Sequence, residues 1–210
     1  MEDHPVTREG FAQLINYQPG FQVCGEAGTA TAALAGIQAT RPDAAIVDLA
    51  LGSGGDGIEL IKQIVATCPN VPVLVLSTFD EALYAERAMR AGARGYVMKQ
   101  TSTHEVMNAI RKVLRGELYL TPAMQARLAH RQLRGSGKTS AGDVNSLSDR
   151  ELEVFQNLGQ GLSTKQIAQI LHCSVSTIET HRNHIKQKLG LKHGLELLRH
   201  AIEWVTRRFG

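Results

Sequence analysis

Short apolar runs alternate with segments of helical periodicity over the first 118 residues. Four runs rich in β-branched residues, 21–24, 44–47, 71–76 and 95–98, predict strands. Between them lie segments of roughly a dozen residues whose apolar positions recur every three or four residues, as on one face of a helix. Strands that alternate with helices favour a doubly wound α/β domain with a parallel sheet.

No strand pattern appears beyond residue 147, where the chain shows helical signals only. Serines precede Glu or Gln by three positions in four places, which is the spacing of the helix capping box. These pairs are Ser148–Glu151, Ser163–Gln166, Ser176–Glu179 and, in the front part of the chain, Ser102–Glu105. Helices that begin so close together must be short and sharply connected, as in motifs that push a helix into a DNA groove.

The apolar periodicity stops between residues 133 and 147. The Gly- and Ser-containing stretch 135–142 is typical of a flexible, solvated linker. An amphipathic helix is expected just before it, over residues 122–133. The pattern therefore predicts an α/β domain over 1–118, a linker with a helix over 119–146, and an all-helical domain over 147–210.

Composition indicates the location of the protein and the kinds of ligand that it can bind. No run of about 18 apolar residues could span a membrane, and the acidic start lacks a secretory signal, so a cytoplasmic location is expected. The three cysteines have no paired spacing, which argues against a disulfide framework and a zinc site. Residues 1–118 carry a net charge of −3, whereas 119–146 and 147–210 each carry +3. This asymmetry favours a cation-binding front domain and a rear domain that meets phosphates.

Polar residues stand at the ends of the predicted strands, where ligand sites of doubly wound sheets lie. Asp48, Ser77 and Lys99 each follow a strand, and Glu2 and Asp3 stand where a first strand would end. Three neighbouring carboxylates would repel one another without a shared cation, and oxygen-rich sites of this kind suit Mg²⁺. A metal-supported aspartate can act as a nucleophile toward phosphorus.

The front part of the chain resembles the receiver domain of bacterial two-component response regulators of the NarL/FixJ subfamily. The resemblance rests on Glu2-Asp3-His4-Pro5, Arg8-Glu9-Gly10, Asp48-Leu49, Gly57-Ile58-Glu59-Leu60, Ser77, Ala91-Gly92-Ala93 and Gly95-Tyr96 through Lys99. It implies a flavodoxin-like fold in which Asp48 accepts a phosphoryl group from a sensor histidine kinase. It also implies that Glu2, Asp3 and Asp48 bind Mg²⁺, while Ser77, Tyr96 and Lys99 respond to the phosphoryl group.

The chain departs from the family pattern in two places. The family has an apolar first strand directly before its acid pair, and that strand is central in the 2-1-3-4-5 order. Here Met1 directly precedes Glu2, so the first strand is absent and we expect a mis-assigned start or a truncated chain. An upstream in-frame apolar stretch of about six residues would support this expectation. The loop 52–55 also replaces the usual proline and adds one residue before Gly57, which predicts a looser loop.

The helix predicted over 176–189 has one narrow apolar stripe, formed by Ile178, Ile185 and Leu189. Its opposite face carries hydrogen-bonding groups of both senses, which suits reading of the major groove. That face consists of Glu179, Thr180, Asn183, His184, Lys186 and Gln187. A preceding helix over 164–171 would lie across it after a turn at 172–174.

Residues 147–206 resemble the LuxR-type helix-turn-helix. The matching segments are Leu147-Ser148-Asp149-Arg150-Glu151, Gly161 to Ala168, Thr177-Ile178-Glu179, His181-Arg182 and Lys188-Leu189-Gly190. The resemblance implies binding to double-stranded DNA, with base contacts from Glu179, Thr180 and Asn183. It implies phosphate contacts from Lys165, Thr177, Arg182, Lys186 and Lys188. For Glu179, a capping role in its own helix stays an equal alternative.

The last predicted helix, over 195–205, has apolar residues on two adjacent arcs. One arc holds Leu195, Leu198, Ile202 and Val205, and the other holds Leu197, Ala201 and Trp204. Together they are wider than one packed face needs, which predicts a homodimer that reads two half-sites. The alternative is that both arcs are core.

These patterns favour a transcription factor controlled by phosphorylation of Asp48. A DNA-binding regulator whose receiver is degenerate or truncated and serves as an interaction module is the alternative. A phosphatase with an aspartate nucleophile is a third and poorly supported hypothesis. Such enzymes typically need a second aspartate two positions after the first, where this chain has Ala50. We therefore expect a regulator and not an enzyme.

Overall fold

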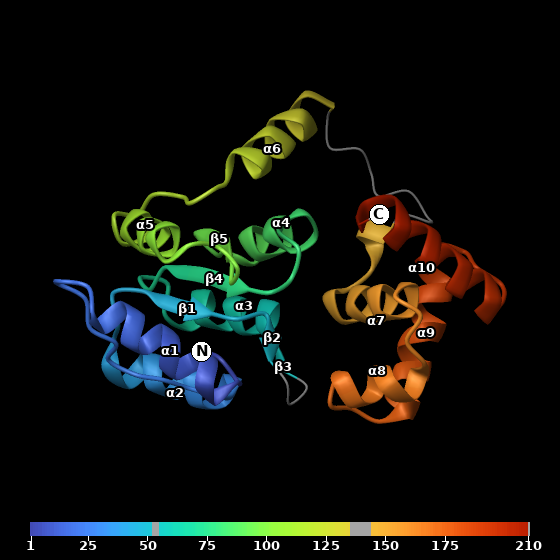
Figure 1. Cartoon of the computed structure of the whole chain (residues 1–210), viewed down its shortest axis with the longest axis horizontal. Helices are drawn as coiled ribbons and strands as arrows, with labels where there is room; N and C mark the ends of the chain where they lie inside the picture. Colours follow the sequence, from blue (N-terminus) through green and yellow to red (C-terminus); the bar gives the residue numbers. More distant parts are fainter. Residues whose placement is uncertain (52–54, 135–143, 210) are drawn as a thin grey trace. The chain divides into compact units, whose positions relative to one another are not determined.

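The computed structural model describes residues 1–51, 55–134 and 144–209, which form two compact units (Figure 1). One unit contains residues 1–51 and 55–133, and the other contains the helices after α6 (Pro122–Arg134). The predicted flexible stretch 135–142 and most of the glycine-rich loop, residues 52–54, lie outside the described residues. None of the described helices is long and apolar enough to cross a bilayer.

The first unit is built on a parallel sheet of three strands in the order β1-β4-β5. These are β1 (Ala45–Val47), β4 (Val73–Ser77) and β5 (Gly95–Met98), which confirms three of the four predicted strands. Every residue of β4 is buried, as expected for a parallel strand covered on both faces. Two short strands, β2 (Ala50–Leu51) and β3 (Gly55–Asp56), pair antiparallel beyond the end of β1.

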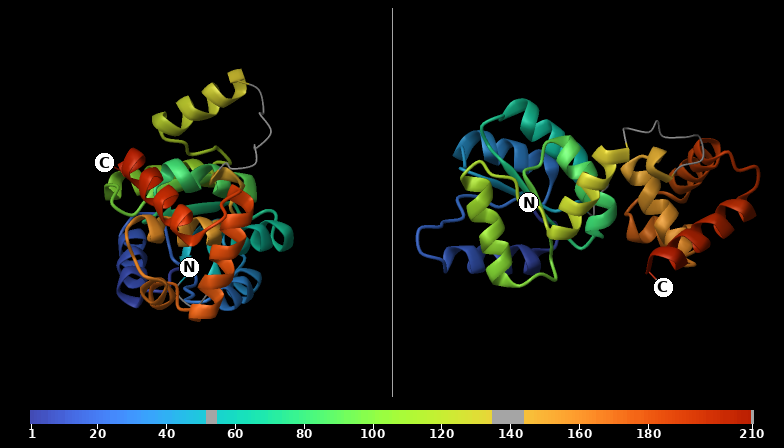
Figure 2. Two further views of the ribbon diagram at one scale, coloured as in Figure 1. Left: turned by 90° about the vertical axis from the view of Figure 1, so that its right-hand side faces the viewer. Right: turned by 90° about the horizontal axis from the view of Figure 1, so that it is seen from above.

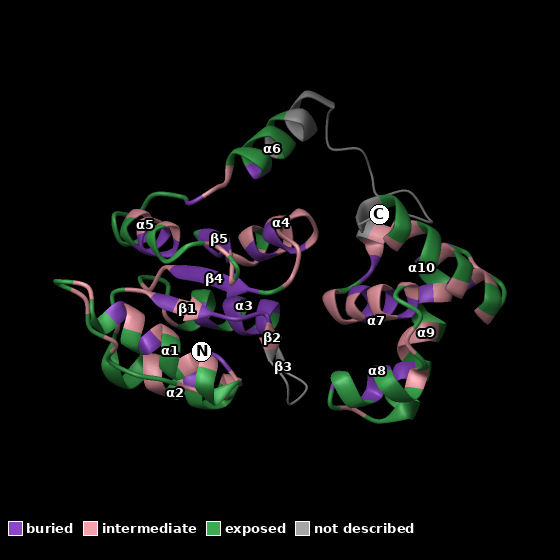
Figure 3. Cartoon of the chain, viewed as in Figure 1, coloured by how far each residue is buried: buried purple, intermediate pink, exposed green. Residues whose placement is uncertain are grey.

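Helices cover both faces of this sheet. They are α1 (Pro5–Asn16), α2 (Ala30–Thr40), α3 (Gly57–Thr67), α4 (Glu81–Ala91) and α5 (Thr103–Leu114). Leu76 and Val97 of the sheet share one core with Ile15 of α1 and Ile110 of α5. Figure 2 shows α1 and α5 on one side of the sheet and α3 on the other. Buried residues therefore line both faces of the sheet (Figure 3).

The predicted helix over 122–133 is present as α6 (Pro122–Arg134). Its start is tied to the first unit, because the Thr121 hydroxyl donates a hydrogen bond of 2.6 Å to Glu81 at the start of α4. Met124 in its first turn is buried.

The prediction of a strand over 21–24 is wrong. This segment has no strand pairing, and the amide of Val23 instead donates to the side chain of Asn16 at 2.7 Å. A hollow of about 570 Å³ is lined both by this segment and by β1, and Ile15, Ile37 and Ile110 also line it. Backbone groups that face a hollow cannot pair across it, so the extended segment forms no ladder with β1.

The first two residues pair with the end of β1. The Met1 amine donates to the carbonyl of Ile46 at 2.7 Å, and the amide of Asp48 donates to the carbonyl of Met1 at 3.1 Å. The amide of Glu2 donates to Ala27 on the other side at 3.1 Å. Burial lowers the pKa of the Met1 amine. These contacts fix Glu2 beside the carboxyl end of the sheet.

The second unit consists of packed helices. They are the 3₁₀ turn η1 (Val144–Ser146), α7 (Asp149–Gly159), α8 (Thr164–Ile170), α9 (Val175–Leu189) and α10 (Gly194–Phe209). Phe155, Ile167, Ile178 and Leu197 are fully buried between them. Helices α7 and α10 approach closely at Gly159, where a Cβ would lie 2.4 Å from a methyl of Val205.

Two of the predicted capping boxes in this unit are confirmed, at Ser148 and Ser163. Ser102 likewise caps α5. The prediction of a box at Ser176–Glu179 is wrong, because α9 begins earlier, with Ser174 as its cap. The Ser174 hydroxyl accepts the amide of Thr177 at 3.0 Å. The carboxylate of Glu179 therefore does not cap α9.

Candidate functional site

An acidic pocket lies at the carboxyl end of the sheet. Asp48 directly follows β1, and the pairing of residues 1–2 with β1 places Glu2 next to it. Asp48 is 2% exposed and Glu2 is 6% exposed. Asp48 also accepts the amide of Ala50 at 3.2 Å, which fixes the orientation of its carboxylate. Two buried carboxylates in one place require a compensating positive charge.

Lys99 supplies that charge from the end of β5. Its ammonium lies 2.7 Å from an oxygen of Asp48 and 2.5 Å from an oxygen of Glu2. Burial alone would lower the pKa of Lys99, but the hydrogen bonds and charges of Asp48 and Glu2 outweigh it and raise this pKa. The predicted residues Glu2, Asp48 and Lys99 are thus brought into one ion-paired cluster.

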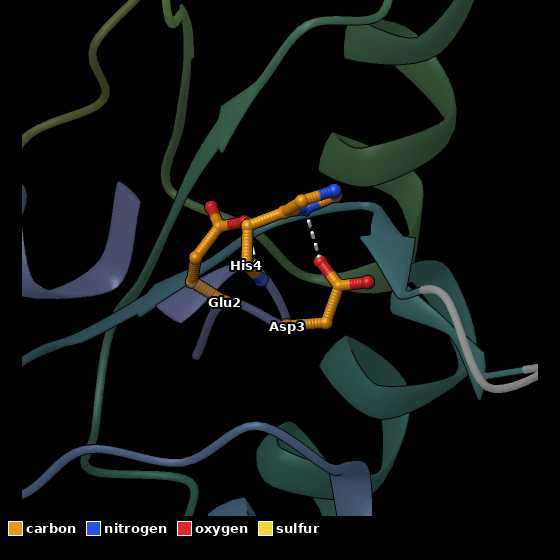
Figure 4. Close-up of side chains that lie close together, drawn as sticks. All are labelled: Glu2, Asp3 and His4. Carbon is orange, nitrogen blue, oxygen red and sulfur yellow. Dashed lines mark hydrogen bonds and ion pairs between the residues drawn. The ribbon is translucent and has the colours of Figure 1, made fainter. Parts of the chain in front are cut away.

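Asp3 and His4 lie next to Glu2 in the same cluster of side chains (Figure 4). The Nδ1 atom of His4 lies 2.9 Å from Asp3 and 3.3 Å from Glu2. The ligand atoms of these three side chains all lie within 4.8 Å of one another. The donors of Glu2, Asp3 and Asp48 are carboxylate oxygens, the set that fits a hard cation such as Mg²⁺. His4 belongs to the same cluster, although the sequence pattern did not single out its side chain.

Ser77 is the last residue of β4, Tyr96 lies within β5, and both are buried. The hydroxyl of Ser77 accepts the amide of Phe79 at 3.3 Å, and the hydroxyl of Tyr96 donates to the carbonyl of Phe79 at 2.7 Å. Burial raises the pKa of Tyr96. Phe79 in turn stacks on Tyr84 of α4, with ring centroids 4.7 Å apart. One residue, Phe79, therefore links Ser77, Tyr96 and α4.

Gly57 explains how close α3 comes to the pocket. A Cβ at this position would lie 2.5 Å from Leu49 Cα and 2.6 Å from the carbonyl oxygen of Asp48. No side chain fits at such distances, so only glycine lets α3 begin against the residues that carry the acidic pocket.

The polar face predicted on α9 is exposed. Thr180 and Asn183 are both solvent-accessible, and the Thr180 hydroxyl donates back to the carbonyl of Ser176 at 3.0 Å. Lys165 and Thr177 are also exposed, whereas Lys186 is partly buried. These residues lie on α8 and α9, the two helices of the predicted helix-turn-helix. The turn between them is sharp, with His172 in the left-handed region at a φ of 47°.

Three other residues predicted to contact DNA form ion pairs within the second unit: Glu179, Arg182 and Lys188. Arg182 lies 2.8 Å from Glu179, and it also donates to the hydroxyl of Thr164 at 2.8 Å. Lys188 lies 2.6 Å from Glu151 of α7. The hydrogen bond from Arg182 to Thr164 connects α9 to the start of α8, and the pair of Lys188 with Glu151 connects α9 to the first turn of α7.

The two apolar arcs of α10 have different surroundings. Leu197 and Ala201 are fully buried, and Trp204 packs edge-on against Phe155 with ring centroids 5.7 Å apart. The second arc is therefore core, and its assignment to a dimer face is wrong for Leu197 and Ala201. On the first arc, Leu195 is 80% and Ile202 is 42% exposed.

A doubly wound sheet with an acidic pocket and a helix-turn-helix unit is the architecture of a DNA-binding response regulator. Residues 1–111 match the family described as response regulator receiver domain, and residues 145–201 match bacterial regulatory proteins of the luxR family. The chain belongs to the response regulators that combine these two domains.

Individual relatives agree with this assignment. The chain is 34% identical to "Oxygen regulatory protein NreC" of Staphylococcus carnosus, over 96% of this chain and 94% of that protein. It is 31% identical to the response regulator ChrA of a heme-sensing two-component system, with a TM-score of 0.51, over 97% of this chain and 94% of ChrA.

A structure of RcsB dimers bound to DNA is also similar. Its TM-score is 0.55 at 26% identity, over 95% of this chain and 94% of that chain. The predicted fold class, and the prediction of a regulator rather than an enzyme, are confirmed by these matches.

Proposed function

We propose that this chain is a transcriptional regulator whose DNA binding is controlled by phosphorylation of Asp48 from a sensor histidine kinase. The observation that carries the proposal is the ion-paired cluster of Asp48, Glu2 and Lys99 at the carboxyl end of the sheet. A phosphoryl group would move from the kinase histidine to a carboxylate oxygen of Asp48. The P–N bond breaks as the P–O bond forms, and the histidine nitrogen recovers the bonding electron pair.

The residues around Asp48 have distinct roles in this proposal. Glu2, Asp3 and Asp48 would hold Mg²⁺, which when bound neutralises phosphoryl oxygens. Lys99 would remain paired with Asp48 and stabilise the added charge. Ser77 would donate its hydroxyl proton to a phosphoryl oxygen, and turning toward that oxygen would draw the hydroxyl away from the amide of Phe79. Because Tyr96 donates to the same residue, this exchange would loosen the Phe79 contacts and move α4.

We further propose that the rear unit, with boundaries near residue 147, binds double-stranded DNA through α8 and α9. Thr180 and Asn183 are exposed on one face of α9 and would contact base edges, with Glu179 beside them. Lys165, Thr177, Lys186 and Lys188 would contact phosphates. For Lys188 this requires sharing its ammonium between DNA and Glu151.

A homodimer would let two copies read two half-sites. Leu195 and Ile202 are exposed on the same arc of α10, with Leu198 between them. Apolar side chains in that position are the support for dimerisation through α10.

Phosphotransfer can be tested with acetyl phosphate and Mg²⁺. Mass spectrometry of the full chain should find an acid-labile adduct about 80 Da heavier than the protein, the mass that a phosphoryl group adds. Asp48→Asn should remove the adduct, whereas Asp43→Asn, another aspartate of the same unit, should keep it. An adduct that survives Asp48→Asn would contradict the assignment.

A phosphorylation-independent regulator is the second candidate function. The ion pairs of Lys99 with Asp48 and Glu2 favour it, because they satisfy both carboxylates without a phosphoryl group. In this case DNA affinity would be the same before and after acetyl phosphate treatment, and Asp48→Asn would bind DNA like the wild type.

A further inference from the structure

Arg182 occupies an enclosed position in the helix-turn-helix. One nitrogen of its guanidinium, Nη1, donates both to the Thr164 hydroxyl and to the Glu179 carboxylate, each at 2.8 Å. The Thr164 hydroxyl also donates to the same carboxylate oxygen of Glu179 at 3.2 Å. Three side chains, from the first residue of α8 and from two turns of α9, therefore form a closed hydrogen-bonded triangle.

The guanidinium is largely enclosed by the protein. The side chain of Arg182 is 23% exposed, and its Nε atom is buried with no hydrogen-bond partner among the described residues. The Nη2 atom faces the start of α10, where a Cβ on Gly194 would lie 3.5 Å away. An arginine that binds phosphate presents two nitrogens of its planar guanidinium to the ligand, whereas here Nη1 is engaged by Thr164 and Glu179 and Nε is buried.

Glu179 has the opposite exposure. Its side chain is 51% exposed, yet both of its partners hold it at the α8 side of α9. A carboxylate near DNA repels phosphates unless a cation compensates it or it accepts a hydrogen bond from a base. Arg182 is the cation that compensates it.

We propose that Arg182 is a positioning residue that fixes the start of α8 and the Glu179 carboxylate relative to the base-contacting face of α9, and that it does not bind phosphate. This inference rests on the proposed DNA-binding function. It predicts that loss of Arg182 changes base preference and leaves the number of phosphate contacts the same.

The test uses the full chain and duplexes selected from a randomised library, with binding measured by fluorescence anisotropy at several salt concentrations. Arg182→Gln and Lys186→Gln each remove one positive charge from α9. Lys186→Gln should lower the slope of log K against log salt by about 0.9, the value for one phosphate contact. Arg182→Gln should keep the wild-type slope but broaden the base preference recovered by selection. An equal fall in slope for both variants would overturn the proposal.

The double variant Glu179→Gln/Arg182→Gln provides a rescue experiment. If Arg182 acts by compensating Glu179, Arg182→Gln should lower affinity about tenfold in the wild type but much less in the Glu179→Gln background. An equal loss in both backgrounds would mean that the guanidinium contacts DNA directly, and it would overturn the proposal.

A readout without DNA separates this inference from the proposed function. Thermal unfolding followed by Trp204 fluorescence should show that Thr164→Val and Arg182→Gln together lower Tm by less than the sum of their single effects. If the Tm losses of the two single variants add up in the double variant, the hydrogen-bonded triangle of Thr164, Glu179 and Arg182 is contradicted. If no duplex is selected by the wild type, the proposed function fails, and the Tm comparison still decides whether Arg182 holds α8.

Discussion

The Lys188 ammonium lies 2.6 Å from a carboxylate oxygen of Glu151, whose side chain is only 5% exposed. The same carboxylate oxygen accepts the amide of Ser148, and the Ser148 hydroxyl accepts the amide of Glu151 in return. One acidic side chain thus closes the capping box of α7 and fastens α9 to it. The position of the proposed reading helix depends on this carboxylate remaining ionised.

Glu151→Gln should destabilise the rear unit by about 1.5–3 kcal/mol, because it removes charge-assisted hydrogen bonds from a buried group. Urea unfolding followed by the fluorescence of Trp204 reports this unit, because Trp204 is the single tryptophan and packs on Phe155. Glu203→Gln, on the exposed side of α10, is the matched control and should have little effect. Equal stability of the two variants would contradict the role of Glu151.

The same residue predicts a pH dependence. Burial alone would raise the pKa of Glu151, but the hydrogen bonds from Lys188 and Ser148 outweigh it and lower this pKa below the ordinary 4.5. A carboxyl whose pKa is lowered by folding stabilises the fold above its unfolded pKa and loses this contribution as pH falls through the folded value. The urea midpoint of the wild type should therefore fall below pH 4.5 more steeply than that of Glu151→Gln.

Lys99→Gln should destabilise the first unit by about 3 kcal/mol, because Glu2 and Asp48 would be left buried without their cation. Mg²⁺ should restore more stability to this variant than to the wild type, since a divalent ion can replace the lost charge. Circular dichroism during thermal unfolding, with Mg²⁺ and with EDTA, measures both effects. The same Mg²⁺ response in both proteins would argue against a cation site at these carboxylates.

Two glycines at helices of the first unit should respond in opposite ways to alanine. A Cβ at Gly36 in α2 meets nothing within 4 Å, so Gly36→Ala should stabilise the unit by about 0.5–1 kcal/mol through helix propensity. A Cβ at Gly57 would clash with Leu49 and Asp48, so Gly57→Ala should cost about 1–3 kcal/mol. Urea titrations of the two variants by circular dichroism give the comparison, and a stabilising Gly57→Ala would contradict the close approach of α3.

Leu195→Glu should weaken a homodimer formed through α10 at least about tenfold, because a charge would replace an apolar side chain at the contact. Sedimentation velocity over a concentration series measures the change. Leu118→Glu replaces another exposed leucine, in the first unit, and should leave the dimer unchanged. A dimer insensitive to Leu195→Glu would place the interface elsewhere.

Local patterns in the sequence predicted much of this structure. The strands β1, β4 and β5 carry the predicted apolar runs, the boxes at Ser148 and Ser163 have the predicted spacing, and all five are present. The box at Ser176 failed because Ser174 stands two residues earlier with the same chemistry, and spacing alone does not choose between two serines. The strand over 21–24 failed because strand formation needs a partner elsewhere in the chain.

In the candidate sites too, some contacts could be predicted from the sequence and others could not. Asp48 and Lys99 follow strands, so parallel pairing alone brought them together, as predicted. The triangle of Thr164, Glu179 and Arg182 joins residues 15 and 18 positions apart across a sharp turn. Only the angle between α8 and α9 decides that contact, and no periodicity in either helix encodes it.

The flank of β1 beside the hollow has a consequence for handling the protein. Among the described residues, only Met1 pairs with the end of β1 on that flank: its amine donates to the carbonyl of Ile46 and its carbonyl accepts the amide of Asp48. A flank with so little pairing can recruit a strand of another molecule. Concentrated samples would then self-associate through the first unit, independently of α10.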